Sequence, residues 1–580
     1  MNNKKLIAIL MTATLAVSSL TGCGVKETGN EKNTESAVSK ETVSSESKEV
    51  TSEVEEGFDP RKICEGVKIT IAAPENLKVK DYNTNVMTLE AEEALGLDIE
   101  FVTYASADYK TKLEVMVQGG TELPDILLSP GKANVPKWAE AGALIDLTEY
   151  YDDPDFSANI RAGEEDCGQD ITSLMKSADG KIYGIPLYAP GYSGESWDKF
   201  WIYEPWLEAL GEDMPTTIDE FYELCKLVAN TDLNGNGKKD EIPLAGAGLG
   251  YNDKSHTKGW FSGLMSSFIY AFDSEWRVVE DGKISYAYTT DEWKEGLKYI
   301  KKFIDEGLIL KDSFVLTNEQ WEAIAYQEDT VLFAFSNARY RGTDYETGRN
   351  YSYMAPLVGP DGVQYSGYRP ETANVGAVIT ADCKNPDAAF LLLDFWCQER
   401  YGIMQRFGEE GVDWDYWENA QIENKDAYGP KVSTAEISIV TYDDAGFWNG
   451  DEPVAAGFRQ TGPLIRAPHI VDGWATLQAV ETDEDIWNKE IMDKMAEADV
   501  EAHKYFPEEA IVELKLTTDE TASISDITTV LNSYVPEITA AFLTGEKDID
   551  KDWDAYLAEL EKIGYKNLLN VYQTAYDRAK

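Results

Sequence analysis

The stretch Asp179–Trp206, DGKIYGIPLYAPGYSGESWDKFWIYEPW, contains the point at which we expect the chain to cross from one lobe to another. It opens on the turn dipeptide Asp179-Gly180 and continues into a short apolar run, Lys181–Leu187. Glycine and proline inside an apolar run mark a bend or a close backbone approach rather than a plain central strand. We therefore predict a strand, a kink and an aromatic-rich segment that lines a cleft. A core strand followed by a core helix is the alternative interpretation.

The size and charge of the chain narrow the class of protein. With 580 residues it is too long for one hydrophobic core, so we expect at least two lobes. Its formal net charge of -53 argues against nucleic acid and anionic membrane surfaces as partners, because phosphate binding needs clustered Lys and Arg. The six cysteines have no CxxC spacing and the three histidines form no HExxH motif, which argues against a zinc site.

The N-terminus has the features of an export signal. Lys4 and Lys5 precede the apolar run Leu6–Val17, which is too short to span a bilayer comfortably. The following Leu-Thr-Gly-Cys, which ends at Cys23, matches the bacterial lipoprotein processing box. This pattern predicts a signal peptide over residues 1–22 and a diacylglycerol group on Cys23. The two acyl chains of that group would anchor the protein, because two chains hold a protein at a membrane where one does not. An ordinary secretory signal followed by an incidental cysteine is the alternative.

A polar segment follows the processing site. Residues 24–57 are rich in Glu, Ser, Thr, Lys and Val and contain no aromatic residue. Such a composition buries too little apolar surface to order itself, so we expect residues 23–58 to be a lipidated cysteine and a disordered tether. The expected location is the cell membrane, on its extracytoplasmic face and through the lipid anchor only. The five remaining cysteines are an odd number, so a disulfide framework is not expected, although one bridge is compatible with the count.

The first folded segments indicate a mixed α/β lobe. Val67–Ala72, VKITIA, alternates like a strand, and Leu97–Val102, LDIEFV, is a second strand. Between them, Thr88–Gly96 has the composition of a helix that ends at a glycine. Strand, helix and strand in this order favour an α/β class of fold.

Several segments in sequence carry a family resemblance. They are KLEVMVQGGTELPDILL at 112–128, W-x₃-GALIDLTEYYD at 138–152, DGKIYGIP at 179–186, MPTTIDEF at 214–221, GAVITADCKNPDAAFLLLDF at 376–395, GEEGVDW at 408–414 and the C-terminal FLTGEKDIDKDWDAYLAELEKIGYKNLLNVYQTAYDR. In order and spacing they resemble family 1 of the extracellular solute-binding proteins of ABC transporters. The resemblance runs from about residue 65 to the end of the chain and rests on the shared order of the segments.

This resemblance implies a two-lobed, type II periplasmic-binding-protein-like fold with a hinge. We expect lobe 1 to comprise about 59–190 and 360–430, and lobe 2 about 191–359 and 431–580. The implied function is a lipid-anchored receptor, a monomer by default, that closes on a ligand and delivers it to the permease of an ABC importer. The resemblance also implies that the protein is not an enzyme.

A loop with regularly spaced oxygen ligands predicts calcium. In DLNGNGKKDE, residues 232–241, side-chain oxygens recur at Asp232, Asn234 and Asn236. Ca²⁺ takes six to eight hard oxygen ligands, and a tight loop with this spacing directs them inward. The loop is not a complete EF-hand, because its twelfth position is Pro243 instead of a bidentate Glu. A polar turn without an ion is the alternative.

The same loop resembles the calcium loop of alginate-oligosaccharide-binding proteins in the same broad family. That resemblance implies ligation by the side chains of Asp232, Asn234, Asn236, Asp240 and Glu241 and by the Lys238 carbonyl. The expected role of the ion is structural, because the loop directly follows the predicted helix Ile218–Ala229.

The aromatic residues suggest a carbohydrate ligand, because sugars present flat apolar faces and a rim of hydroxyl groups. The candidate contacts in segments of loop character are Tyr188, Trp197, Trp201, Trp260, Trp448 and Trp474. Arg339 and Tyr340, just after the apolar strand Val331–Phe335, resemble a family position that faces the cleft. Arg369, Asn374, Asp443 and Asn449 are candidate polar partners. For any single aromatic residue, a place in the core is the competing interpretation.

Two other functions remain open from the sequence. The first is a receptor for a peptide or another nutrient on the same fold. The second is a carbohydrate-active enzyme, which also uses carboxylates and aromatic residues. The sequence contains no GxSxG, no HExxH and no phosphate-binding loop, and this favours the receptor over the enzyme.

Overall fold

The structure is a computed structural model of the whole chain. It describes residues 57–579 except 197, 252–258, 326–331, 338–347, 424, 426–427, 433, 443–452 and 478–482. The predicted signal peptide, Cys23 and nearly all of the predicted tether lie outside the described residues. No helix in the described part of the chain combines the length and the apolar character needed to cross a membrane.

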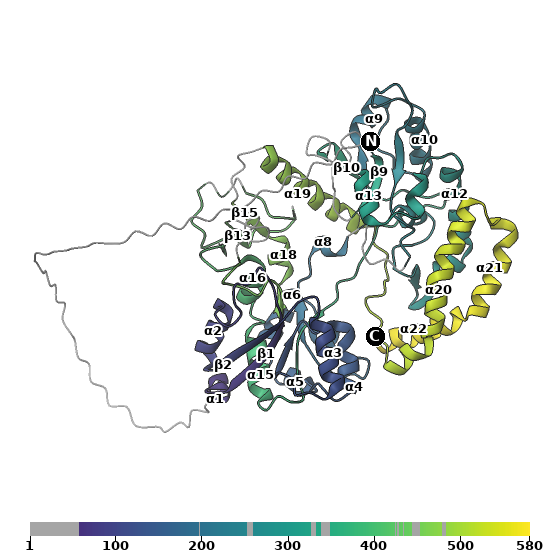
Figure 1. Cartoon of the computed structure of the whole chain (residues 1–580). Helices are drawn as coiled ribbons and strands as arrows, with labels where there is room; N and C mark the ends of the chain where they lie inside the picture. The colour runs from purple at the N-terminus through teal and green to yellow at the C-terminus, as the bar shows by residue number, and fades with distance from the viewer. Residues whose placement is uncertain are drawn as a thin grey trace, which may run out of the picture. The chain divides into compact units, whose positions relative to one another are not determined.

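The first sheet contains six strands in the order β14-β4-β11-β3-β1-β2. Its strands β1 and β2 lie side by side in Figure 1. The strands are β1 (Lys68–Pro74), β2 (Asp98–Tyr104), β3 (Ile126–Leu128), β4 (Ile185–Tyr188), β11 (Asn374–Ile379) and β14 (Leu464–Ile465). β11 runs antiparallel to both of its neighbours, and the other pairs are parallel. The carboxyl ends of β1, β2, β3, β4 and β14 therefore share one edge of this sheet.

Helices cover both faces of this sheet, and their local sequences explain their ends. α2 (Val86–Leu95) begins at Asn85, whose side chain accepts from Met87 N, and ends at Gly96 in the left-handed region. The other helices packed around this sheet are α1 (Pro60–Cys64), α3 (Tyr109–Gly119), α4 (Val135–Glu140), α5 (Thr148–Asp152), α6 (Ala158–Cys167), α7 (Ile171–Met175), α15 (Pro386–Phe395) and α16 (Glu399–Phe407). The predicted strand–helix–strand start of the chain is confirmed.

The second sheet contains four strands in the order β10-β5-β9-β6. They are β5 (Lys199–Tyr203), β6 (Ile242–Ala245), β9 (Leu332–Asn337) and β10 (Tyr351–Met354). Among the described residues, five helices and a hairpin complete this region. The helices are α9 (Glu204–Leu210), α10 (Ile218–Ala229), α11 (Trp260–Met265), α12 (Asp291–Asp305) and α13 (Asn318–Ala325), and the hairpin is formed by β7 (Arg277–Glu280) and β8 (Lys283–Tyr286). Its buried core is separate from the core of the first sheet, so the chain builds two α/β lobes.

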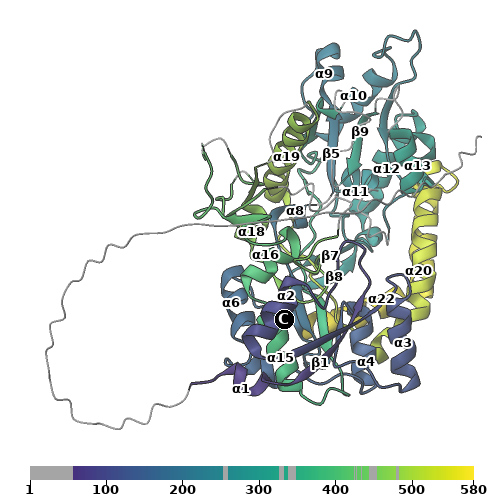
Figure 2. The same cartoon turned by 60° about the vertical axis from the view of Figure 1, so that its left-hand side comes forward.

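A C-terminal group of three helices packs on the second lobe. α20 (Thr518–Thr544) lies against α12, and α22 (Tyr565–Ala579) packs beside it (Figure 2). α21 (Ile549–Ile563) packs on α20 as well (Figure 1). Leu531, Val535 and Phe542 of α20 are part of the buried core of this lobe. The capping box of Thr517 and Glu520 fixes the start of α20.

A small sheet lies beside the first lobe. Its order is β12-β13-β15, with β12 (Trp414–Tyr416), β13 (Ile439–Thr441) and β15 (Trp474–Thr476). Trp414, Ile439 and Ile470 form its core together with residues of α16, and α18 (Pro468–Asp472) leads into β15. β14 pairs with β4 in the first sheet, although we expected residues 431–580 to belong to the second lobe. The exact lobe boundaries stay a prediction.

Three segments connect the two lobes. Residues 189–198 lead from β4 to β5, and residues 355–373 lead from β10 to β11. The third segment, residues 503–517, follows α19 (Asp483–Ala502) and contacts both lobes: Lys515 Nζ donates to Leu174 O at 2.8 Å in the first, and Glu509 Oε2 accepts from Gly282 N at 3.1 Å in the second. The crossing predicted within Asp179–Trp206 is where the chain leaves the first sheet.

The five cysteines in the described part of the chain, Cys64, Cys167, Cys225, Cys383 and Cys397, are all free thiols. Three of them are buried.

Candidate functional site

The carboxyl edge of the first sheet faces the region through which the chain crosses to the second. β4 ends at Tyr188 and leads through one crossing segment to Lys199, the first residue of β5. β10 ends at Met354 and leads back to Asn374, the first residue of β11. In open α/β sheets, ligands bind outside the carboxyl ends of the strands. The crossing region is therefore the candidate ligand cleft.

Two crossing segments pack closely enough to require glycine. Arg369 N donates to Glu195 O at 2.9 Å, so residues near 195 and 369 lie side by side. A Cβ atom at Gly194 would overlap the carboxylate of Glu371, and one at Gly191 would lie 2.8 Å from Asp472 Oδ1. The predicted close backbone approach occurs at these glycines.

Glu371 is the most perturbed carboxyl group in this region. Burial and the neighbouring Glu195 raise its pKa from 4.5 to about 7, although Arg369 and a hydrogen bond from the Gly191 backbone oppose the shift. Glu371 therefore keeps its proton to a higher pH than a solvent-exposed glutamate does. Nothing in the sequence signals this shift, because it depends on glycines and carboxylates that only the fold brings together.

Replacing Glu371 by Gln is expected to reduce the loss of stability between pH 5 and pH 8. The unfolded chain releases the Glu371 proton near pH 4.5 and the folded chain near pH 7, so the folded state holds more protons in this window and the wild type loses stability as the pH rises. The change in Tm between pH 5 and pH 8 should be smaller in the variant by about 2 °C. An equal change in both proteins contradicts the prediction.

An ion pair and a histidine hold the first crossing segment against α19 and against His503, which directly follows α19. Lys199 Nζ lies 2.6 Å from Asp499 Oδ1, and Ser196 Oγ donates to the same oxygen at 2.6 Å. Both charged side chains are 3% exposed or less. His503 Nε2 lies 3.1 Å from Glu195 Oε2. The segment that carries position 197 is thus held at both ends.

A cavity of about 300 Å³ lies beside the crossing segments. Four parts of the chain line it: Asp198, residues 270–279, residues 367–372 and residues 509–513. Its lining combines aromatic rings (Tyr270, Phe272, Tyr368) with charged groups, which are Asp198, Asp273, Arg277, Arg369, Glu509 and Glu513. Rings flanked by carboxylates and guanidinium groups are the combination that suits a polyhydroxylated ligand.

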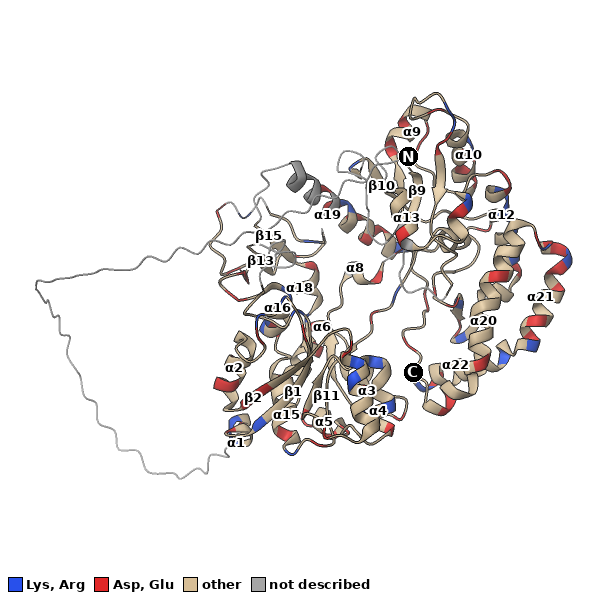
Figure 3. Cartoon of the chain, viewed as in Figure 1, with Lys and Arg blue, Asp and Glu red and all other residues tan. Residues whose placement is uncertain are grey.

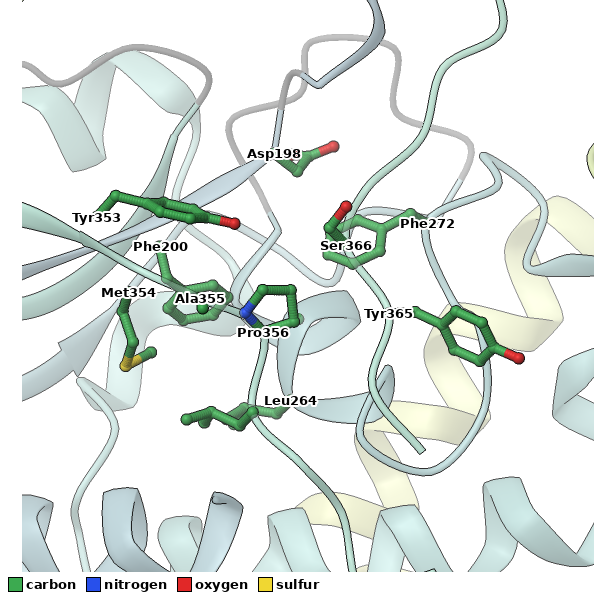
Figure 4. A pocket seen from close by; sticks show the side chains of 12 residues that line it. Asp198, Phe200, Leu264, Phe272, Tyr353, Met354, Ala355, Pro356, Tyr365 and Ser366 are labelled. Atoms are coloured by element: carbon green, nitrogen blue, oxygen red, sulfur yellow. The ribbon is translucent and has the colours of Figure 1, made fainter. Parts of the chain in front are cut away.

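A smaller pocket adjoins this cavity through Asp198 and Phe272, which line both (Figure 4). Figure 4 shows the rings of Phe200 and Tyr353 beside Ala355 and Pro356, at the ends of β5 and β10. Sequence reasoning missed Asp198. Its position directly before a strand at a lobe crossing was the available signal.

Three of the predicted ligand contacts are buried. Tyr188 is 4% exposed in the core of the first lobe, and Trp201 and Trp260 are fully buried in the second lobe. Trp260 Nε1 donates to Gly248 O at 2.6 Å, so its polar atom is already used. These three rings pack inside the cores, which is the alternative that we considered for each single aromatic residue.

Trp474 differs from these three, because it is partly exposed at the start of β15. Its ring lies 5.3 Å from that of Phe407. The other predicted contacts, Trp197, Arg339, Tyr340 and Trp448, lie outside the described residues, as do Asp443 and Asn449. The structure does not gather Trp474 with the cavity residues named above, and its role as a ligand contact stays a prediction.

The predicted calcium loop is a tight turn after α10, which ends at Ala229 as expected. Gly235 and Gly237 have φ values of 73° and 84°, which glycine adopts without strain. Asp240 Oδ1 accepts from Asn236 Nδ2 at 3.0 Å, and Asp232 Oδ2 accepts from Gly237 N at 2.9 Å. Asn236 is the main cause of the lowered pKa of Asp240. The ligand residues therefore already converge on one another.

One oxygen of this loop lacks a partner. Glu241 Oε1 accepts from Leu233 N at 2.7 Å and from Asn234 N at 3.1 Å, whereas Glu241 Oε2 is buried and has no hydrogen bond to any described residue. An unsatisfied buried carboxylate oxygen is costly, and a bound cation would satisfy it. Within the described ranges, no three His, Cys, Asp or Glu side chains form a metal site by themselves. The donor set therefore fits calcium only with the Asn side chains and the Lys238 carbonyl included.

Comparison with known proteins gives a consistent result. The sequence model of the bacterial extracellular solute-binding proteins matches residues 80–403. The fructooligosaccharide ABC transporter substrate-binding protein FusA of Streptococcus pneumoniae serotype 4 is 26% identical over 600 aligned residues, which cover 98% of this chain and 97% of that protein.

Two solved structures have the same fold. The HMO-binding, ABC-transporter-associated solute-binding protein of Bifidobacterium longum infantis has a TM-score of 0.68 at 17% identity, and the match covers 88% of this chain and 99% of that one. An EF-hand mutant of S. pneumoniae FusA in complex with fructo-nystose has a TM-score of 0.57 at 23% identity, with the same coverage. These likenesses show the two-lobed α/β solute-binding fold.

Proposed function

Because the chain belongs to the bacterial extracellular solute-binding protein family, we propose that it captures an oligosaccharide between its two lobes and delivers it to the permease of an ABC importer. Closure of the lobes about the crossing segments would bury the ligand, and the importer would recognise the closed form. The matched family and relatives are binding proteins of transporters and not enzymes.

The cavity at the crossing segments is the observation that carries this proposal. It combines rings and charged groups from the second lobe, from the 355–373 crossing and from the third connection. A ligand held there would contact all three, and closure would bring the first lobe against it. FusA, which is similar over nearly the whole chain, is a fructooligosaccharide-binding protein by name, and this supports a saccharide.

A thermal-shift screen of the purified protein, in calcium, tests the proposal. At a hundred times its dissociation constant, an oligosaccharide ligand is expected to stabilise the protein by about 2.7 kcal/mol. The panel contains neutral and acidic oligosaccharides and peptides of similar mass. Stabilisation by peptides alone would favour the peptide receptor, and release of shorter sugars from any oligosaccharide would favour an enzyme.

The calcium site is proposed as a structural element of the same protein. Asp232, Asn234, Asn236, Asp240, Glu241 and the Lys238 carbonyl would hold the ion, which would neutralise carboxylates and fix the exit of α10. The unsatisfied Glu241 Oε2 supports this set. An EF-hand in FusA, which is evident from the name of its mutant, is a second support.

The lipid anchor is proposed from the sequence alone. Cys23 at the end of the processing box would carry the acyl chains, and residues 24–57 would separate the folded part from the membrane. Lipoprotein LipO of Bacillus subtilis, 28% identical over 237 residues, supports this proposal. A monomer at the extracytoplasmic face, with lobe boundaries near those given above, completes the proposal.

A further inference from the structure

The loop that follows α10 contains two asparagine–glycine pairs in succession, Asn234-Gly235 and Asn236-Gly237. All four residues are exposed to solvent, and the two glycines have φ values of 73° and 84°. In such a pair, the backbone nitrogen of the glycine can attack the side-chain amide of the asparagine, because glycine has no Cβ atom that shields its nitrogen. The loop therefore offers two sites for the same covalent change.

The side chains of the two asparagines have matched surroundings. Asn234 Oδ1 accepts from Asn236 N at 3.0 Å, and Asn236 Oδ1 accepts from Lys238 N at 2.8 Å. Each side-chain carbonyl thus closes a turn with the backbone two residues further on. Both amide groups donate to the same oxygen, Asp240 Oδ1, at 3.3 Å from Asn234 and 3.0 Å from Asn236. The side chains alone give no reason for the two sites to react differently.

The nitrogens of the two glycines differ. Gly237 N donates to Asp232 Oδ2 at 2.9 Å. Gly235 N makes no hydrogen bond within the described part of the chain. A hydrogen bond to a carboxylate is stronger than one between neutral groups. Gly237 has to give up such a bond before its nitrogen can attack, whereas Gly235 has none to lose.

We propose that Asn234 is a deamidation site and that the fold protects Asn236 from the same reaction. The nitrogen of Gly235 forms a bond to Cγ of Asn234, the bond between Cγ and Nδ2 breaks, and ammonia leaves with the proton of Gly235 N. Water then opens the five-membered succinimide. Addition of water at Cγ breaks the new bond and gives aspartate, and addition at the backbone carbonyl breaks the original peptide bond and gives isoaspartate.

Either product changes the loop. Aspartate at position 234 lacks the amide that donates to Asp240 Oδ1, and it places a second carboxylate against Asp240. Isoaspartate adds a carbon atom to the backbone path and displaces the residues that follow. Both products add negative charge to a chain of formal net charge -53, whose acidic residues already lie on helices of both lobes (Figure 3). Because ammonia is lost, the modification is an irreversible loosening of the turn after α10.

Peptide mapping of the purified protein by mass spectrometry tests the inference. The folded protein is incubated at mildly alkaline pH in excess chelator, so that the rates depend on the chain alone. Trypsin releases both asparagines in one peptide, Leu227–Lys238, and its fragment ions give the two rates from one sample. Asn234 is expected to deamidate about 10-fold faster than Asn236, which is the factor that a hydrogen bond from Gly237 N to a charged oxygen contributes.

One variant and one change of conditions separate the effect of the fold from that of the sequence. Asp232→Ala removes the acceptor of Gly237 N and should raise the rate at Asn236 to that at Asn234. In denaturant, the wild type should react at nearly equal rates at both positions, and this comparison decides the matter if the variant does not fold. Asn230 precedes the β-branched Thr231 in the same peptide and should stay intact as the internal control.

Several results would overturn the inference. They are equal rates at Asn234 and Asn236 in the folded protein, a faster reaction at Asn236, and an intact Asn234 in folded protein when the denatured protein reacts. A preference for Asn234 that is equally large in denaturant would assign it to the sequence and not to the fold. A folded Asp232→Ala protein in which Asn236 stays slow would show that the bond from Gly237 N is not the cause. The measurement uses neither calcium nor saccharide, so the proposed function stands or falls separately.

Discussion

Lys199→Met is expected to lower the free energy of unfolding by about 3–5 kcal/mol. The variant keeps the length of the side chain but removes the charge that lies 2.6 Å from Asp499 Oδ1. The Asp499 side chain, which is 3% exposed, would then be left in the interior without its cation and with only the hydroxyl of Ser196 on that oxygen. An uncompensated buried charge is among the most destabilising single changes, and the second lobe should unfold at a lower denaturant concentration.

The double variant Lys199→Met/Asp499→Leu separates the charge effect from the loss of packing. Apolar replacement of a whole buried ion pair is often neutral or stabilising, so the double variant should recover most of the stability lost in the single one. The measurement is equilibrium denaturation followed by tryptophan fluorescence. A single variant within about 1 kcal/mol of the wild type would show that water or a rearranged side chain compensates Asp499.

Chelation of calcium is expected to lower the Tm, with a loss of about 4 kcal/mol if the protein had been saturated at a thousand times the dissociation constant. The ion would bind the folded loop and not the unfolded chain, so its removal leaves three carboxylates close together and Glu241 Oε2 buried without a partner. Differential scanning calorimetry in calcium and in excess chelator measures the difference.

Glu241→Gln provides the internal control for this experiment. In chelator, the variant should be at least as stable as the wild type, because an uncharged amide replaces a buried carboxylate. In calcium, it should gain much less than the wild type. Identical melting curves of the wild type in calcium and in chelator would contradict the calcium site.

Much of the fold could be predicted because its signals are local. The helix 218–229 starts at a capping box and was predicted with the bounds that α10 has, and Gly96 ends α2 as expected. The strands predicted from residues 67 and 97 by the alternation of apolar and polar residues correspond to β1 and β2. The pairing of β14 with β4 could not be predicted, because a two-residue strand has no periodicity and its partner lies far away in sequence.

The site was harder to predict than the fold. Aromatic residues in segments of loop character turned out to be core residues, as Trp201 and Trp260 show, because aromatic content indicates burial as readily as ligand stacking. Glu371 was not predicted, since its raised pKa comes from burial and from Glu195, which is distant in sequence. The calcium loop could be predicted from the sequence because its oxygen donors lie within ten consecutive residues.

The arrangement of the first sheet has a consequence for biogenesis. Its strands run from residue 68 to residue 465, and β4, in the interior of the sheet, acquires its outer neighbour only when β14 arrives. Until that moment, β4 presents an unpaired backbone edge of the kind that promotes aggregation. Closing such distant pairs is slow, because the loop entropy is lost before the contacts are gained. The nascent chain therefore depends on being kept apart from its copies until most of its length has been synthesised.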